Sequence, residues 1–180
     1  MMGSLLTRNR LIGLALAALI AAVDQAIKFY VVGPLNLRSV RHIELLPFFD
    51  FTYVENRGIS LGMLQATSME MRWLLVGMTA LIALVVLVWM MREKWLGDIL
   101  GLALILGGAV GNIRDRYVLG YVIDYADLHI GTFRPFMIFN VADAAITIGV
   151  LIILARSLLM REKDDNTQPD ADGETVPAEN

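Results

Sequence analysis

The most constraining feature of this sequence is one uninterrupted apolar run in its middle. Residues Arg72 to Met91 read RWLLVGMTALIALVVLVWMM, and no charge follows the first residue. An α-helix rises about 1.5 Å per residue, so about twenty such residues cross the hydrocarbon core of a bilayer. The run therefore predicts a membrane-spanning helix. It belongs to a chain that is 57% hydrophobic.

Three further apolar runs are long enough to span a membrane, although each contains polar residues: Leu11–Val32, Leu96–Ile113 and Phe136–Met160. We therefore predict a membrane all-α fold, a bundle of four transmembrane helices at about residues 11–32, 72–91, 96–113 and 136–160, in one domain over residues 1–163. The alternative for the first run is a cleaved signal peptide, because Arg8 and Arg10 precede it. Its apolar character continues through Val32, beyond a plausible cleavage site, which favours a retained helix.

The basic residues predict the orientation of this bundle. Lys and Arg gather in cytoplasmic loops, and here they gather at the amino terminus, in the short connection after the second run and at the exit of the fourth: Arg8, Arg10, Arg92, Lys94, Arg156, Arg161 and Lys163. Both termini are expected in the cytoplasm, although the bias is moderate because the opposite loops also carry arginines. Residues 164–180 hold six carboxylates and no base, so we expect an acidic, disordered cytoplasmic tail.

The two long loops on the other side have strand-like composition. Residues Leu46–Val54 (LPFFDFTYV) and Asp127–Phe133 (DLHIGTF) are rich in aromatic and β-branched residues. They predict a small extracytoplasmic β-sheet. The sheet is either a simple cap over the bundle or a platform that holds an extended peptide by strand addition.

Polar residues converge on the same end of the predicted bundle. A charged side chain inside a membrane helix is costly unless it faces a partner or a cavity. The residues at this level come from the ends of three helices and from the two loops: Asp24, Lys28, Asn56, Asn112, Asp115, Arg116, Asp124, Asn140 and Asp143. Asp98 alone lies near the opposite face, at a helix start where the helix dipole favours an anion.

Helical spacing groups some of these residues. Gly108, Asn112 and Asp115 share one face of the third helix, and Asn140 and Asp143 share one face of the fourth. Gly107 and Gly111 form a small-xxx-small pair that lets another helix approach.

Structural interpretations of single residues remain open at this point. Asp24 can simply pair with Lys28, Asp115 with an arginine, and Asn112 can bridge two helices.

Asp124 and Asp143 differ from the other acidic residues, because neither has a basic residue three or four positions away. Two carboxylates held close together cannot both ionise cheaply, so one keeps its proton. Such a pair can act as general base and general acid in the hydrolysis of an amide by water.

Other chemistries fit less well. The chain has no cysteine and no HExxH motif, so no metal or cofactor is expected. A Ser–His pair would have to use His42 or His129, both in loops, and a Ser60–Lys28 pair conflicts with Asp24 beside Lys28. A proton relay or small transporter would need titratable groups across the bilayer depth, and a scaffold would have little use for two unpaired aspartates.

The ordered motifs of the chain resemble the five conserved blocks of the lipoprotein signal peptidase (signal peptidase II) family. The blocks are Val23-Asp24-Gln25 with Lys28, Asn56-Arg57-Gly58, Gly107-Gly108-Ala109 with Gly111 to Arg116, Val122 to Tyr125, and Phe139 to Asp143. The resemblance implies an intramembrane aspartyl endopeptidase of the bacterial cytoplasmic (inner) membrane. Such an enzyme removes the signal peptide from diacylglyceryl-modified prolipoproteins, cutting before the lipidated cysteine.

The resemblance also assigns roles to residues. It implies that Asp124 and Asp143 are catalytic, and that the following residues shape or support the site: Asp24, Asn56, Gly108, Asn112, Asp115, Arg116 and Asn140. It further implies an extracytoplasmic β-cradle with the site on that side, contacts with membrane lipids, and inhibition by globomycin-type compounds. Ile59, Ser60, Leu61 and Tyr125 depart from the family pattern and concern the walls of the site, hence substrate preference.

Overall fold

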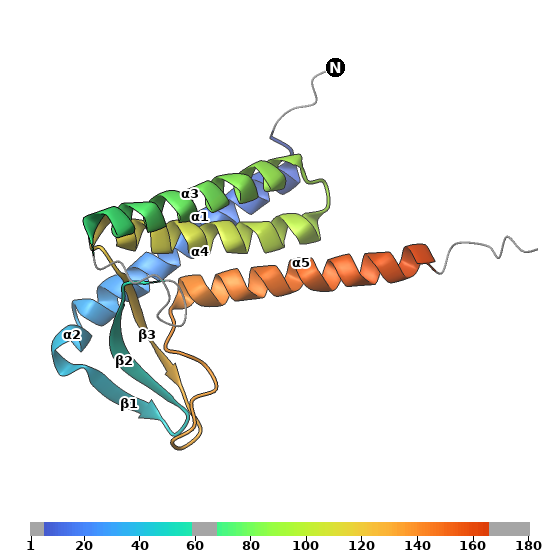
Figure 1. The fold of residues 1–180 in the computed structure, drawn as a ribbon. Coiled ribbons are helices and arrows are strands. Elements are labelled where there is room, and N and C mark those ends of the chain that lie inside the picture. Colours follow the sequence, from blue (N-terminus) through green and yellow to red (C-terminus); the bar gives the residue numbers. More distant parts are fainter. Residues whose placement is uncertain (1–5, 59–67, 166–180) are drawn as a thin grey trace, which may run out of the picture.

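The computed structural model describes residues 6–58 and 68–165. Four of its helices, α1 (Arg8–Val32), α3 (Met69–Arg92), α4 (Leu96–Val118) and α5 (Val141–Asp165), are long and apolar enough to cross a membrane. Figure 1 shows them side by side, with the start of α1 and the end of α5 at one end of the bundle and the β-sheet at the other. The predicted four-helix membrane fold with a small sheet is confirmed.

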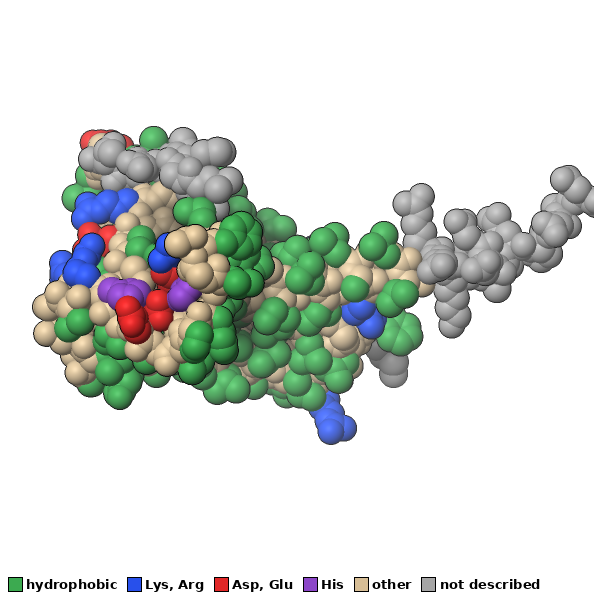
Figure 2. All heavy atoms as spheres, turned by 90° about the horizontal axis from the view of Figure 1, so that it is seen from below, with side chains coloured by type: hydrophobic (Ala, Val, Ile, Leu, Met, Phe, Trp, Pro, Cys, Tyr) green, Lys and Arg blue, Asp and Glu red, His purple; other side chains and the backbone are tan. Residues whose placement is uncertain are grey.

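Helix α4 is the centre of the bundle. It packs against α1, α3 and α5, and half of its apolar stretch is buried, whereas about a fifth of each other span is. The outward faces of the other helices expose large aliphatic side chains, such as Leu81 and Val85 on α3 and Leu151 on α5. Figure 2 shows such hydrophobic side chains along the helical part of the molecule. Exposed apolar surface of this extent is typical of a lipid-facing protein.

Several predicted helix boundaries differ from the structure: α1 and α3 each begin three residues earlier, and α5 ends five residues later. Two further differences lie near the sheet. The third predicted helix, 96–113, continues to Val118, which places Asp115 and Arg116 inside α4. The fourth, 136–160, begins only at Val141. The residues before it are extended, because Phe139 exchanges backbone hydrogen bonds with Ala126 of the sheet, at 2.8 and 3.1 Å.

The sheet has three antiparallel strands in the order β1 (His42–Leu46), β2 (Phe49–Asn56) and β3 (Val122–Leu128). A short helix, α2 (Leu37–Val40), joins α1 to β1. The predicted strand 46–54 overlaps β2, but β1 was not predicted. The predicted strand 127–133 is wrong beyond Leu128, since the chain there turns through Gly131 at φ 60°. Asn56 and Asp124, expected in loops, lie in strands β2 and β3.

The sheet is attached to the bundle by its own hydrophobic core. Buried Val31 and Leu37, from the end of α1 and from α2, pack with Tyr53, Ile123 and Tyr125 of the sheet. The connection from α4 to β3 is tight and passes through Gly120 at φ 88°, a backbone conformation that favours glycine. Strand β3 is therefore held close to the end of α4, and the segment that pairs with it leads directly into α5.

Candidate active site

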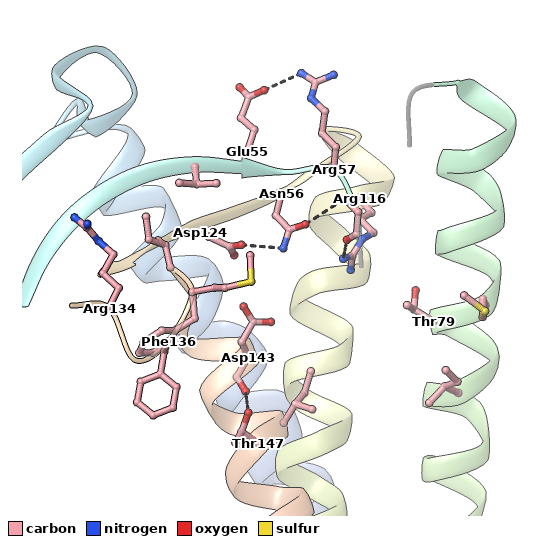
Figure 3. Close-up of a pocket in the computed structure, with 18 residues that line it drawn as sticks. Glu55, Asn56, Arg57, Thr79, Arg116, Asp124, Arg134, Phe136, Asp143 and Thr147 are labelled. Carbon is pink, nitrogen blue, oxygen red and sulfur yellow. Dashed lines mark hydrogen bonds and ion pairs between the residues drawn. The ribbon is translucent and has the colours of Figure 1, made fainter. Parts of the chain in front are cut away.

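A cavity of about 860 Å³ lies where the sheet meets the bundle, and both Asp124 and Asp143 line it. Figure 3 shows Asp124 entering from β3 and Asp143 from α5, on the same open space. The remaining walls come from β2, α3, α4, the segment before α5 and α5 itself, and include Asn56, Thr79, Arg116, Phe136 and Ile146. The structure thus brings the two predicted catalytic residues together.

The first turn of α5 fixes Asp143. Asn140, which directly precedes the helix, accepts a hydrogen bond from the Asp143 backbone N–H through its Oδ1, at 2.9 Å. In return, the Asn140 backbone N–H donates to Asp143 Oδ2, at 3.3 Å. This is a capping box built from an Asn and an Asp, and the amino-terminal end of the helix dipole favours the negative charge of Asp143.

Strand β3 fixes Asp124, which is 2% exposed. Asn140 Nδ2 donates to Asp124 Oδ1 at 2.6 Å, and Asn56 Nδ2 donates to Asp124 Oδ2 at 3.0 Å. Burial and the nearby charge of Asp143 raise the pKa of Asp124 to about 7, against the opposing effect of these two hydrogen bonds. Asp124 is therefore partly protonated near neutral pH, while both of its oxygens remain held in place.

Two asparagines connect the carboxylates. Asn140 binds Asp143 through its Oδ1 and Asp124 through its Nδ2, so one side chain sets the relation between the two acids. Asn112 of α4 donates from Nδ2 to Asp143 Oδ1 at 2.8 Å. The structural interpretation of Asn112 as a bridge between helices is thus correct, and one of its partners is a predicted catalytic residue.

Asp24 and Asp115 lie next to the site but do not line the cavity. Both bind the ammonium group of Lys28, at 2.9 and 2.7 Å, and all three side chains are at most 2% exposed. Asp24 also accepts the backbone N–H of Ala142 at 3.0 Å, so α1 caps the start of α5. The expected Asp24–Lys28 pair is present, but Asp115 pairs with Lys28 of α1 and not with an arginine.

Arg116 lies on the cavity wall. Its guanidinium donates to Gly58 O at 3.0 Å, which ties α4 to the segment that follows β2. Its own backbone oxygen accepts a hydrogen bond from Arg72 Nε at 2.9 Å, and Arg72 also donates to Tyr117 O. Arg72 of α3 therefore caps the carboxyl-terminal end of α4, where a cation complements the helix dipole.

Gly108 allows α4 and α5 to touch. A Cβ atom at this position would collide with Ala142 O and would lie 2.8 Å from Ile146 Cγ1. Gly107, on the neighbouring face, meets Ala17 O of α1 in the same way, at 2.5 Å. The predicted close approach through glycine is therefore present on both sides of α4.

The sequence reasoning missed several residues of this region. Arg134, Phe136, Met137 and Ile138 line the cavity, because the segment before α5 is not helical as expected. The Gln25 side-chain amide donates to Asp24, Gly111 O and Asp115, at 2.9–3.2 Å. Pro135 gave no signal against a helix that begins at Phe136, since proline is tolerated at a helix start.

Metal ligation has no support among the residues that the structure describes, which contain no group of three or more His, Cys, Asp or Glu placed to hold an ion. Of the departures from the family pattern, Ile59, Ser60 and Leu61 lie outside the described residues, as do residues 166–180 of the predicted tail. Tyr125 is buried in β3 beside Asp124 and stacks edge-on against Phe51.

Comparison with known proteins decides the family. The model of the family described as "Signal peptidase (SPase) II" matches residues 16–159. The chain belongs to the signal peptidase II family. The lipoprotein signal peptidase of Sphingopyxis alaskensis is 56% identical over 151 residues, which are 84% of this chain and 87% of that protein. That of Rhizorhabdus wittichii is 53% identical and covers 86% of this chain and 90% of its own.

Solved structures agree on the fold. A bacterial membrane enzyme determined by the in meso method at 1.9 Å is 27% identical, has a TM-score of 0.69 and covers 82% of this chain and 92% of its own. A second structure with the same description, at 2.3 Å, has a TM-score of 0.72 and is 23% identical. The match covers 92% of this chain and 94% of that one. The predicted family is confirmed, and this signal peptidase II is a multi-pass peptidase of the bacterial inner membrane.

Proposed function

We propose that this signal peptidase II removes the signal peptide from diacylglyceryl-modified prolipoproteins by an aspartic mechanism, cutting before the lipidated cysteine. Asp124 and Asp143 are the catalytic pair in this proposal. One observation carries it: two carboxylates from separate elements line the same cavity and are joined by a single asparagine side chain, Asn140.

The chemistry follows from the different surroundings of the two acids. Asp143 accepts hydrogen bonds from Asn112 Nδ2 and the Asn140 N–H at the start of a helix, which stabilise its ionised form. Asp124 lies in strand β3, where no helix amino terminus favours its charge, so in this proposal it holds the proton that the pair shares. Asp143 is then the general base and Asp124 the general acid.

Each proton has a defined path in this reaction. Asp143 takes a proton from water as the water oxygen bonds to the scissile carbonyl carbon, and Asp124 gives its proton to the carbonyl oxygen. The tetrahedral diol then collapses: Asp143 returns a proton to the leaving nitrogen as the C–N bond breaks, and Asp124 recovers one from a hydroxyl. The product amine is that of the lipidated cysteine, and no covalent enzyme intermediate forms.

The shape of the cavity supports entry of the substrate from the lipid. Met78, Thr79 and Ile82 of α3 and Ile146 and Thr147 of α5 line opposite walls, so the cavity extends down between two lipid-facing helices (Figure 3). An apolar signal peptide can enter there while the acyl chains of the lipidated cysteine stay in the bilayer.

The proposed orientation places both termini in the cytoplasm, because the basic residues Arg8, Arg92 and Arg156 lie toward the end of the bundle away from the sheet. The sheet and the cavity then face the extracytoplasmic side, where water is available. Globomycin-type inhibitors are expected to occupy the same cavity and block access to the dyad.

Cleavage of a defined substrate tests the proposed function. The purified enzyme is incubated with diacylglyceryl-prolipoprotein and, separately, with the same protein lacking the lipid, and the products are identified by mass spectrometry. We expect release of the signal peptide with a cut before the cysteine, for the lipidated protein only. Cleavage at another bond, or no cleavage of the lipidated protein, would refute the proposal.

The pH dependence of kcat/KM is expected to be bell-shaped, with its basic limb near pH 7. Asp124 must be protonated to act as the acid, and its pKa is about 7, so activity is present below that value and is lost as the pH rises through it. Initial rates between pH 5 and pH 9 in a constant-ionic-strength buffer measure this profile. A rate that stays constant from pH 6 to pH 9 would contradict the role of Asp124.

Replacing Asn56 by alanine is expected to move that basic limb to higher pH by about one to two units, since a hydrogen bond to a charged group is worth about 1.5–3 kcal/mol. The Asn56 side chain stabilises ionised Asp124, so its loss raises the pKa of Asp124 further. Thr79→Val is the matched control: Thr79 also lines the cavity, but its hydroxyl donates only within α3, to Leu75 O and Val76 O. If the basic limb moved equally in both variants, it would report the titration of a group other than Asp124.

A further inference from the structure

Lys28 is a buried cation beside the active site but not among the residues that line the cavity. Its ammonium group, 2% exposed, binds Asp24 and Asp115 at 2.9 and 2.7 Å. Its third contact is with Asn112 Oδ1, at 3.3 Å. Asp24 and Asp115 already compensate the charge of the ammonium group, so the hydrogen bond to Asn112 is not needed for that compensation.

The contact with Lys28 fixes the orientation of the Asn112 amide. An ammonium group can only donate hydrogen bonds, so the oxygen of the amide has to face it. Asn140 Nδ2 donates to the same oxygen, at 3.4 Å. The Asn112 NH₂ group is therefore directed to Asp143 Oδ1, at 2.8 Å. The reverse orientation would place an NH₂ group against an ammonium group and an oxygen against a carboxylate.

We infer that Lys28 is a positioning residue for the reaction, which acts through Asn112 on Asp143. By holding the Asn112 oxygen, it keeps an N–H donor on the general base, and this donor stabilises the ionised form that the reaction requires. The inference rests on the proposed function, because it presupposes that Asp143 is the base. It adds a role for a residue on α1, the helix farthest in sequence from Asp143.

The charge around Lys28 decides how the residue can be tested. Lys28 is surrounded by the carboxylates of Asp24, Asp115, Asp124 and Asp143. Arg116 and Tyr125 are the other charged or titratable groups near Asp143. Removing Lys28 alone would leave Asp24 and Asp115 as uncompensated buried carboxylates and would prevent folding for a reason unrelated to catalysis. Replacing Asp115 by Asn at the same time restores the net formal charge of the triad, which is one negative unit in the wild type.

Two double variants keep this net charge and differ only in whether the side chain at position 28 can donate a hydrogen bond to Asn112. Lys28→Met/Asp115→Asn removes the donor to Asn112, whereas Lys28→Gln/Asp115→Asn keeps a neutral N–H donor on a side chain of similar size. Thermal unfolding in detergent establishes that each is folded. Relative to the Gln variant, the Met variant is expected to show its acid limb, which reports the ionisation of the base Asp143, at higher pH by about one unit. On the acidic side of that limb its kcat/KM is expected to be roughly tenfold lower. Equal rates and profiles would overturn the inference, because charge or packing alone would then account for Lys28.

A second comparison needs only the Gln variant, in case the Met variant does not fold. The acid limb is measured for the wild type and for Lys28→Gln/Asp115→Asn, each with and without Asn112→Ala. Gln is a weaker, neutral donor than the ammonium group, so a relay predicts that the double substitution displaces the limb more when Asn112 is present than when it is absent. Displacements that simply add would refute it. Failure of the proposed function is seen separately, as activity that survives in Asp143→Asn.

Discussion

Asp143→Asn is expected to lower kcat for prolipoprotein cleavage by between about 10² and 10⁴, the usual contribution of general acid–base catalysis by one group. Asparagine keeps the size and polarity of the side chain, and its oxygen can still accept the hydrogen bond from Asn112 Nδ2. It cannot take a proton from water. Release of the signal peptide from a lipidated prolipoprotein, at saturating substrate, measures the effect.

Asp124→Asn is expected to lower kcat over the same range for the complementary reason. An amide at position 124 cannot give a proton to the carbonyl oxygen, and its single oxygen can accept from only one of the two present donors, Asn140 Nδ2 or Asn56 Nδ2. The basic limb of the pH profile should also disappear from any residual activity. The two substitutions combined should cost little more than either alone, because the acid and the base act as a unit.

The matched control for both variants is Asp98→Asn. Asp98 begins α4 at the far end of the bundle and forms a bidentate pair with Arg156, at 2.6 and 3.1 Å. This variant loses one carboxylate from a membrane helix, as Asp143→Asn does, but it changes nothing at the cavity. We expect it to retain activity within a few-fold of the wild type. Near-normal turnover by Asp143→Asn or Asp124→Asn would show that the aspartate in question is structural.

The sequence predicts the helical bundle well because the bilayer fixes the length of each span. Each predicted span overlaps the observed helix, and no bound differs by more than five residues. The two differences that bear on the site are the carboxyl-terminal end of α4 and the start of α5. The error at α5 has a physical reason: Phe136 to Phe139 are apolar, and apolar composition does not distinguish a buried extended segment from a helix. The pairing of Phe139 with Ala126, across thirteen residues, is a tertiary contact that no local pattern contains.

Strand β3 was missed because its environment conceals the strand pattern. Six of its seven residues are buried, since β2 pairs with one edge, the Phe139 segment lies along the other, and side chains pack on both faces. Alternation of polar and apolar residues marks strands with one solvated face, and β3 has none. Asp124 was therefore assigned to a loop, although it is buried and hydrogen-bonded.

The candidate site could be predicted as a set of residues, but not as a set of contacts. Position along the spans places Asp24, Asn112, Asp115 and Asp143 at one level of the membrane, which is sufficient to predict that they meet. It does not specify which helices are neighbours. Asp115 binds Lys28 of α1 because α4 packs directly on α1, and that packing depends on Gly107, whose absent side chain leaves room for Ala17 O.

Gly108→Val is expected to destabilise the protein by about 3 kcal/mol, at the upper end of the usual effect of overpacking. The added Cβ would meet the backbone oxygen of Ala142, which is followed by Asp143 and cannot move without shifting the start of α5. Catalysis should suffer even in the molecules that fold, since a displacement of about 1 Å at a reacting group can cost about 10²-fold in rate. Thermal unfolding in detergent and the cleavage assay measure the two effects.

Gly77→Val separates this collision from the general effect of valine in a membrane helix. Gly77 lies in α3, and a Cβ atom there would meet no other atom within 4 Å. Both substitutions add the same β-branched side chain to the interior of a spanning helix, so propensity and hydrophobicity change equally. We expect Gly77→Val to unfold at nearly the wild-type temperature and to remain active. If both variants lost stability equally, the contact of α4 with Ala142 would not be what positions Asp143, and the start of α5 would have to be held by Asp24 and Asn140 alone.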